Sequence, residues 1–384
     1  MLHPDVRLRR GMITCVYPAG TLLSGCESNI RLVHDRGRNY PRDDGDDISG
    51  AAMRYPDWGE RSPRWAGIRS ETLDLRGTPV HLLRKPAAPG APPGAPVHLL
   101  IHPMAGSGTA WLDTVGPLSA YGTVIAPDLP GTLFGHTGSP RRNAARAEVN
   151  ARFLRAFTSE LGLERVVLHG WSMGGLVALL FTDLAPRRVE RLVLAAPTLP
   201  GPMTAAERAW WQTLGRLALL AGPPIVRGLL SVLGPKALAV KLDALANPEA
   251  WVARGRDSTG GDILRLSPEM TALLTDQLKE ARSRPRRLSG AVTAFASASS
   301  TMFVNRRPVE TAIGRISPPT LLAWGDRDPV ISRVVIDHLM TQRPDWDLHV
   351  FEGAGHVIPA AIPDAYAEAV AAWLTKHRTV GSRG

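Results

Sequence analysis

The sequence predicts an α/β protein whose sheet is mostly parallel, has eight strands and is covered by helices on both faces. From Ile68 onward, short runs rich in aliphatic and β-branched residues alternate with segments of helical periodicity, which is typical of this fold class. Most of the strand-like runs are almost continuously apolar, as expected for parallel strands buried on both faces. The expected strands are 72–75, 80–83, 97–101, 123–126, 165–169, 191–195, 320–324 and 348–351.

The remaining elements follow in chain order. The first two strands are joined by Arg76-Gly77 and are expected to form a hairpin. A proline-rich spacer, 85–96, leads into the apolar third strand. Amphipathic periodicity predicts covering helices over 143–161, 175–183 and 364–376.

Residues 198–316 carry helical signals and no strand signal. Thr204 and Glu207 form a capping box that opens a helix predicted to run through Leu220, and Pro268 lies in the first turn of another. We therefore expect a helical cap inserted into an α/β core that comprises 53–197 and 317–384. The stretch 214–245 is unusually apolar. Its residues either pack on one another and on the sheet, or partly line a cavity for an apolar substrate.

Residues 1–52 are predicted to be a disordered leader, because they lack a sustained hydrophobic period and are crowded with Gly, Pro, Asp and Arg. Two alternatives remain open. Leu23-Ser24-Gly25-Cys26 matches a bacterial lipobox, so Cys26 could carry a lipid anchor. Translation could instead begin at Met53. We expect a cytoplasmic protein, with the lipid-anchored form as the alternative.

Composition excludes several classes of function. The net charge is +10, but the basic residues are scattered and not interleaved with aromatic residues, so no nucleic-acid partner is expected. No run approaches 18 apolar residues, so no transmembrane segment is expected. The two cysteines, Cys15 and Cys26, both lie in the leader, and no metal or dinucleotide motif is present. No metal and no cofactor are therefore predicted.

The strongest local signal is Gly170-Trp171-Ser172-Met173-Gly174, a G-x-S-x-G pattern between the strand 165–169 and a helical period. On a tight strand-to-helix turn the glycines avoid collisions, and the serine hydroxyl projects at the carboxyl edge of the sheet. The helix that follows begins with free N–H groups, which favour developing negative charge. Ser172 is therefore the candidate nucleophile.

With this motif in its context, residues 68–376 resemble the α/β-hydrolase family, in its serine-nucleophile, esterase-like and lipase-like branch. The resemblance implies an acid and a histidine downstream, each after a late strand. Asp328 follows the strand 320–324 and His356 follows the strand 348–351. We assign them as orienting acid and general base, and Asp326 as a residue that caps its turn.

The resemblance also implies an oxyanion hole made of two backbone N–H groups, those of Met173 and Met104. Met104 lies in the loop after the strand 97–101, where Pro103 departs from the family pattern. His102 and Asp128 are interpreted as structural residues of this region. The aromatic residues Trp171, Trp210 and Trp211 are candidates for the substrate pocket.

These residues predict a serine hydrolase that cleaves a carboxylic ester of a small apolar substrate through an acyl-enzyme. The alternatives on the same triad are thioester, lactone and C–C bond hydrolysis and cofactor-free perhydrolysis. A non-catalytic ligand-binding protein on this fold is the alternative of another class. The sequence does not predict the oligomeric state.

Overall fold

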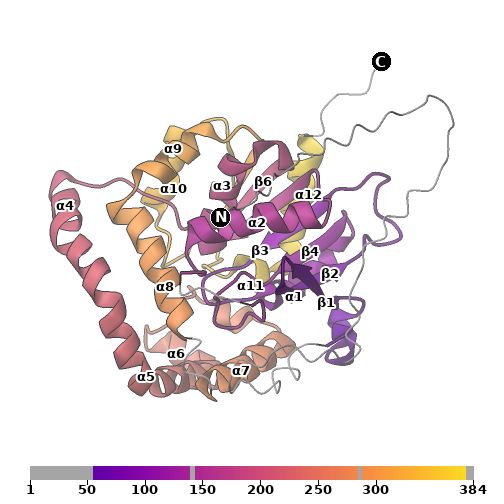
Figure 1. Ribbon diagram of the computed structural model, residues 1–384. Coiled ribbons are helices and arrows are strands. Elements are labelled where there is room, and N and C mark those ends of the chain that lie inside the picture. The colour runs from indigo at the N-terminus through magenta and orange to yellow at the C-terminus, as the bar shows by residue number, and fades with distance from the viewer. Residues whose placement is uncertain (1–54, 139–142, 284–287, 378–384) are drawn as a thin grey trace, which may run out of the picture. The chain divides into compact units, whose positions relative to one another are not determined.

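The computed structural model describes residues 55–138, 143–283 and 288–377. The predicted leader, including Cys26, lies outside these residues. The sheet has the spatial order β1-β2-β4-β3-β5-β6-β7-β8, so its connections cross over as in other doubly wound sheets (Figure 1). Its strands are β1 (Arg69–Leu75), β2 (Thr78–Lys85), β3 (Val97–Ile101), β4 (Thr123–Pro127), β5 (Val166–Trp171), β6 (Val189–Ala195), β7 (Thr320–Gly325) and β8 (Asp347–Phe351).

The predicted fold class is confirmed. The hairpin β1–β2 is antiparallel, β2 pairs antiparallel with β4, and the pairs from β4 through β3 to β8 are parallel. The eight expected strands match the observed ones, and the bounds differ by no more than three residues. The parallel strands end on one edge, and Ser172 follows β5 at that edge.

Side chains that alternate along the central strands form two separate apolar layers. On one face, Leu168 and Leu194 pack with α2 (Ala147–Glu160), α3 (Met173–Leu184) and α10 (Arg333–Gln342). On the other face, Val167 and Val193 pack with α1 (Leu112–Ser119) and α12 (Pro363–Lys376). Burial of both faces explains the continuously apolar strands.

Between β6 and β7 the described chain is helical. It contains α4 (Ala205–Trp210), a π-helical turn η6 (Trp211–Gly215), α5 (Arg216–Ala246), α6 (Pro248–Ala253), the short η7 (Asp262–Arg265), α7 (Pro268–Ser283), α8 (Leu288–Ser299), η9 (Ser300–Val304) and α9 (Arg307–Arg315). The short helices η2 (Trp58–Glu60), η3 (Pro63–Trp65), η4 (Gly108–Trp111), η5 (Pro186–Arg188) and α11 (Ile358–Ala361) lie in the loops around the sheet.

The helix expected to end at Leu220 continues to Ala246, although it contains Pro223, Pro224 and Pro235. A proline removes one backbone donor and its ring clashes with the carbonyl four residues earlier, which bends a helix without necessarily ending it. The chain bends by 78° between Leu230 and Leu233, shortly before Pro235. Among the described residues no single helix is long and apolar enough to cross a membrane.

Candidate active site

Ser172 occupies a strained turn between β5 and α3. Its φ of 56° and ψ of −120° lie in a region of backbone conformation that residues other than glycine rarely adopt. A Cβ on Gly174 would lie 2.3 Å from the carbonyl oxygen of Ile101, and a Cβ on Gly170 would lie 2.5 Å from that of Gly174. The two glycines are thus required by the close approach of β3, β5 and α3. A hydrogen bond to β6 holds the backbone of Ser172 in place: the Ser172 N–H donates to the carbonyl of Ala195 at 2.9 Å.

Three residues from distant parts of the chain form one hydrogen-bonded line. The Ser172 Oγ lies 3.0 Å from His356 Nε2, and His356 Nδ1 lies 2.8 Å from Asp328 Oδ2. The Asp328 side chain is fully buried, and 13% of that of His356 is exposed. Because the Asp328 carboxylate can only accept a hydrogen bond, His356 Nδ1 carries the proton and donates to it. Nε2 is left to accept a hydrogen bond from the serine hydroxyl.

The two aspartates after β7 have different partners. Asp328 uses its second oxygen to accept from the N–H groups of Val330 and Ile331, at 2.7 and 2.9 Å, so its carboxylate is locked toward His356. Asp326 accepts from the N–H of Gly353 at 2.6 Å and points away from this line. The structure therefore brings Asp328, and not Asp326, to the histidine.

A further aspartate holds the histidine turn and was not identified from the sequence. Asp262, in η7, accepts from the N–H of Gly355 at 2.9 Å and from that of Val357 at 2.7 Å. In the same loop, the carbonyl of Thr259 accepts from the N–H of His356 at 3.0 Å. Burial raises the pKa of the Asp262 carboxyl and outweighs the opposing effect of the two backbone donors. The backbone on both sides of His356 is thus bound by the helical segment between β6 and β7.

Met173 and Met104, the two residues predicted to form an oxyanion hole, lie at the start of α3 and in the loop after β3. Met173 is the first residue of α3, and the first N–H groups of a helix lack intrahelical partners. Met104 lies in the turn closed by the Gly106 N–H and the Pro103 carbonyl at 3.1 Å. Ala105 has a φ of 61°, so the loop after β3 makes a sharp turn despite Pro103.

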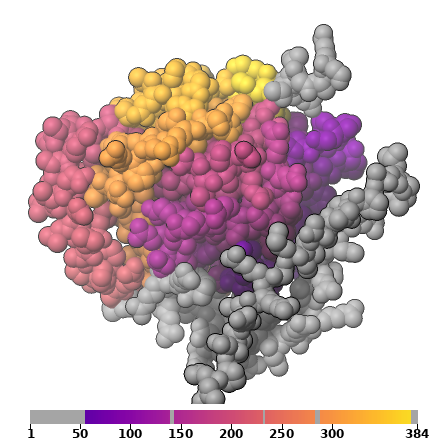
Figure 2. All heavy atoms as spheres, turned by 45° about the horizontal axis from the view of Figure 1, so that its top comes forward, coloured from indigo at the N-terminus to yellow at the C-terminus, as the bar shows by residue number. Residues whose placement is uncertain are grey.

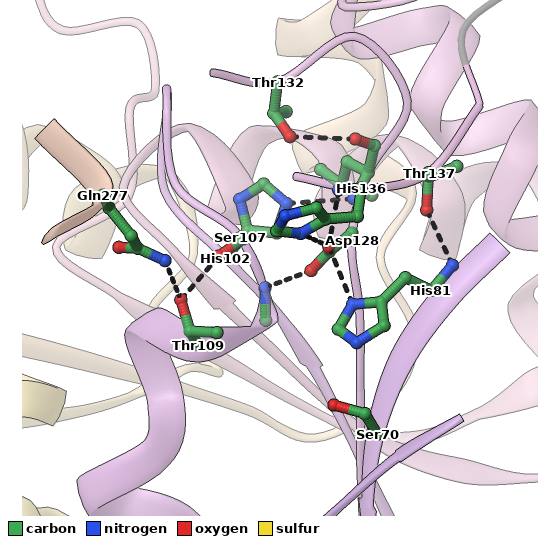
Figure 3. Close-up of polar contacts among 12 residues, drawn as sticks. Ser70, His81, His102, Ser107, Thr109, Asp128, Thr132, His136, Thr137 and Gln277 are labelled. Carbon is green, nitrogen blue, oxygen red and sulfur yellow. Dashed lines mark hydrogen bonds and ion pairs between the residues drawn. The ribbon is translucent and has the colours of Figure 1, made fainter. Parts of the chain in front are cut away.

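His102 and Asp128 form a buried polar network under this loop (Figure 3). His102 Nε2 accepts from the N–H of Leu129 at 3.0 Å, and its Nδ1 donates to the Pro103 carbonyl at 2.8 Å. Burial lowers the pKa of His102, so the ring is neutral. Asp128 accepts from the N–H of Gly108 at 2.7 Å and from His81 Nδ1 at 2.9 Å. Both side chains therefore shape the loop that carries Met104.

Burial alone would raise the pKa of Asp128, but the charge of His81 and the hydrogen bonds from His136 and His81 outweigh it, and the pKa lies well below its ordinary value. In the described part of the chain, His81, Asp128 and His136 form a group whose ligand atoms lie within 4.8 Å of one another. Asp128 Oδ2 already accepts from His81 and from the N–H of His136 at 2.8 Å. Hydrogen bonding by itself accounts for this arrangement.

The three candidate pocket residues lie in two places. Trp171 precedes the serine, is buried, and donates from its indole N–H to the carbonyl of His356 at 2.9 Å. Trp210 and Trp211 contact each other edge to face, and Trp211 stacks on Phe303 at 4.4 Å between ring centroids. Trp171 is therefore part of the triad surroundings, while the described ring contacts of the other two are with the helical segment.

Comparisons with known proteins identify the family of this chain. A model of the alpha/beta hydrolase family matches residues 99–372. The chain is 28% identical over 259 residues to a 2-hydroxy-6-oxo-6-phenylhexa-2,4-dienoate hydrolase of Burkholderia cepacia, which covers 66% of this chain and 78% of that protein. It is also 28% identical over 274 residues to a 2-hydroxy-6-oxononadienedioate/2-hydroxy-6-oxononatrienedioate hydrolase of Cupriavidus pinatubonensis, which covers 68% and 81%.

Among solved structures, the 2-hydroxy-6-oxo-6-phenylhexa-2,4-dienoate hydrolase of Rhodococcus sp. strain RHA1 superposes with a TM-score of 0.58 at 18% identity, over 80% of this chain and 99% of that one. This likeness concerns the fold. The family match covers most of the chain, from within β3 through the serine turn and the histidine turn. The chain belongs to the alpha/beta hydrolase family and is an enzyme of the hydrolase type.

Proposed function

We propose that this enzyme is a serine hydrolase that cleaves a carboxylic ester, or a related acyl bond, of a small apolar substrate. The observation that carries the proposal is the line from Ser172 Oγ through His356 to Asp328, with donor–acceptor distances of 3.0 and 2.8 Å. A serine hydroxyl is a poor nucleophile until a base takes its proton, and a buried carboxylate keeps that base in the required tautomer.

In this mechanism Ser172 Oγ attacks the carbonyl carbon while His356 Nε2 takes its proton. The resulting oxyanion accepts hydrogen bonds from the N–H groups of Met104 and Met173. His356 then gives the proton to the leaving alcohol, and an acyl-enzyme remains on Ser172. Water, deprotonated by His356, attacks the acyl carbonyl and releases the acid, which restores the serine. Asp328 stabilises the charged imidazole in both halves of the cycle.

We also propose that residues 198–316 act as a cap over this site and that Trp171, Trp210 and Trp211 contribute to the substrate pocket. Two contacts support the cap: Asp262 binds the histidine turn, and Gln277 of α7 donates to Thr109 beside the loop after β3 at 2.8 Å. Both join the helical segment to loops of the sheet edge where Ser172 lies.

Hydrolysis of a C–C bond beside a ketone is the second candidate, because two relatives at 28% identity carry that activity in their names. The same serine would attack the ketone carbonyl, and the departing carbon would take a proton in place of an alcohol oxygen. Thioester, lactone and peroxide chemistry need the same three side chains and belong in the same test.

A substrate panel separates these activities. We expect the full-length enzyme to hydrolyse p-nitrophenyl esters, measured as release of nitrophenol, and Ser172→Ala to remove this activity. The 2-hydroxy-6-oxo-6-phenylhexa-2,4-dienoate substrate, followed by loss of its conjugated absorbance, tests the second candidate, and acyl-CoAs and lactones complete the panel. Labelling by a fluorophosphonate probe should map to Ser172. A wild-type enzyme that is neither labelled nor active on any member would instead indicate a ligand-binding protein.

A further inference from the structure

The first half of α5 and the turn before it expose large apolar side chains. Leu214, Leu217, Ile225 and Leu229 have exposed fractions of 60%, 62%, 61% and 54%. Their spacing of three, eight and four residues places them on one side of the helix. We call these four residues the outer apolar face. In Figures 1 and 2 their segment, coloured rose, lies at the left edge of the described part of the chain.

The opposite side of the same helix carries charged and apolar residues together. A hollow of about 680 Å³ between α5 and α8 is lined there by Gln212, Arg216 and Arg227 and by Leu219, Leu220 and Pro223, and Arg227 donates to Thr293 at 3.0 Å. A helix on a water-exposed surface normally directs its apolar side inward and its charged side outward. This one also directs large apolar side chains outward, so its outward side is suited to an apolar environment.

The charges around the outer apolar face are mostly positive. Residues 207–243 contain five basic residues and two acidic residues, Glu207 and Asp243, one at each end of the segment. Arg208 precedes the face in the chain, Lys236 and Lys241 follow it, and the three are exposed. An apolar stripe accompanied by an excess of cations complements a surface that is apolar inside and anionic outside. Two copies of this face would instead bring cations together.

We propose that the outer apolar face binds the surface of an anionic lipid bilayer. The four side chains enter the boundary between headgroups and acyl chains, and the basic residues contact the anionic headgroups. The helix lies along the surface, with the outer apolar face toward the lipid and its opposite side toward α8. This binding is an additional property of the chain and does not depend on the proposed ester hydrolysis.

Sedimentation with vesicles tests the proposal on the full-length chain. We expect the wild type to bind vesicles of phosphatidylglycerol mixed with phosphatidylcholine, to bind pure phosphatidylcholine much more weakly, and to be released as NaCl rises, because salt screens exposed charges. The variant Leu217→Glu/Ile225→Glu should bind the anionic vesicles at least about tenfold more weakly, because two apolar side chains that enter the bilayer become charged. Arg208→Glu/Lys236→Glu/Lys241→Glu should lose most of the preference for anionic lipid.

The matched control is Val334→Glu, which replaces an apolar residue of 61% exposure on α10. It should bind like the wild type, and circular dichroism should show that all variants remain folded. Unchanged vesicle binding by Leu217→Glu/Ile225→Glu overturns the proposal, as does equal binding to neutral and anionic vesicles. A wild-type dimer in sedimentation equilibrium that this double variant converts to a monomer would assign the face to a second copy instead.

Discussion

Replacing Asp262 tests whether the helical segment positions the base of the proposed triad. Asp262→Ala removes the acceptor for the N–H groups of Gly355 and Val357, which flank His356. A hydrogen bond to a charged group contributes about 1.5–3 kcal/mol. Part of the loss is offset, because a buried carboxylate with a raised pKa is removed as well. We therefore expect the turn to lose about 2–3 kcal/mol of its positioning energy.

If that energy holds His356 against Ser172, kcat should fall about 30- to 150-fold, since each 1.4 kcal/mol corresponds to about a factor of ten. Asp262→Asn keeps one acceptor oxygen and should lose about tenfold. KM for a p-nitrophenyl ester should change much less than kcat, because the ester need not touch this turn. Rates are normalised to active sites titrated with a fluorophosphonate, so that a smaller folded fraction does not count as a loss of kcat.

Asp326→Asn is the matched control, because Asp326 also accepts from one N–H of the same turn but lies on its exposed side. It should keep kcat within about threefold of the wild type, whereas Asp328→Asn should be severely impaired. Full kcat in Asp262→Ala, or equal losses in Asp262→Ala and Asp326→Asn, would refute a positioning role for the η7 aspartate.

Three further predictions address the nucleophile, the packing of its turn and the pH dependence of stability. Ser172→Ala should lower turnover of any good substrate by about 10³-fold or more with little change in thermal stability; near-normal turnover would exclude the proposed mechanism. Gly174→Ala should destabilise the fold by about 1–3 kcal/mol in urea unfolding, because its Cβ would meet two backbone carbonyls of the neighbouring loop, whereas Gly116→Ala in α1, with open space at the Cβ, should be neutral or slightly stabilising. Burial lowers the pKa of His98 from 6.5 to about 4, so between these values the unfolded chain binds more protons than the folded one and stability falls as the pH falls. The loss attributable to His98 reaches at most about 3 kcal/mol at pH 4, and His98→Leu should lose less stability than the wild type between pH 7 and pH 4.5; an equal loss would place the acid sensitivity elsewhere.

Patterns that are local in sequence predicted the strands and the serine turn well. The continuous apolar runs identify β3 and β5 because both sides of each strand are buried, and Gly170 and Gly174 mark a turn whose neighbours leave no room for a Cβ. Asp328 and His356 were predicted from the resemblance to a family in which an acid and then a histidine follow the serine along the chain. The structure places His356 within hydrogen-bonding distance of both Asp328 and Ser172.

Other features have no local signature. Asp262 lies 93 residues before Gly355, and nothing in its neighbourhood indicates which N–H groups it binds. The helix predicted to run through Leu220 continues past Pro223 and Pro224 to Ala246. The apolar composition of 214–245 left open packing or a cavity. Composition alone does not show which side of a helix faces outward. In this segment many of the apolar side chains face outward.

The Asp128 network has a consequence for large-scale mutagenesis. Its carboxylate accepts from Gly108, twenty positions earlier, and from His81, forty-seven positions earlier, and so connects β2 and β4 with the loop that carries Met104. A library of single substitutions scored only by product formation would therefore rank Asp128 and His81 beside Ser172, although neither needs to meet substrate. The same library scored by cellular abundance would separate them from Ser172, whose replacement should leave the amount of protein unchanged.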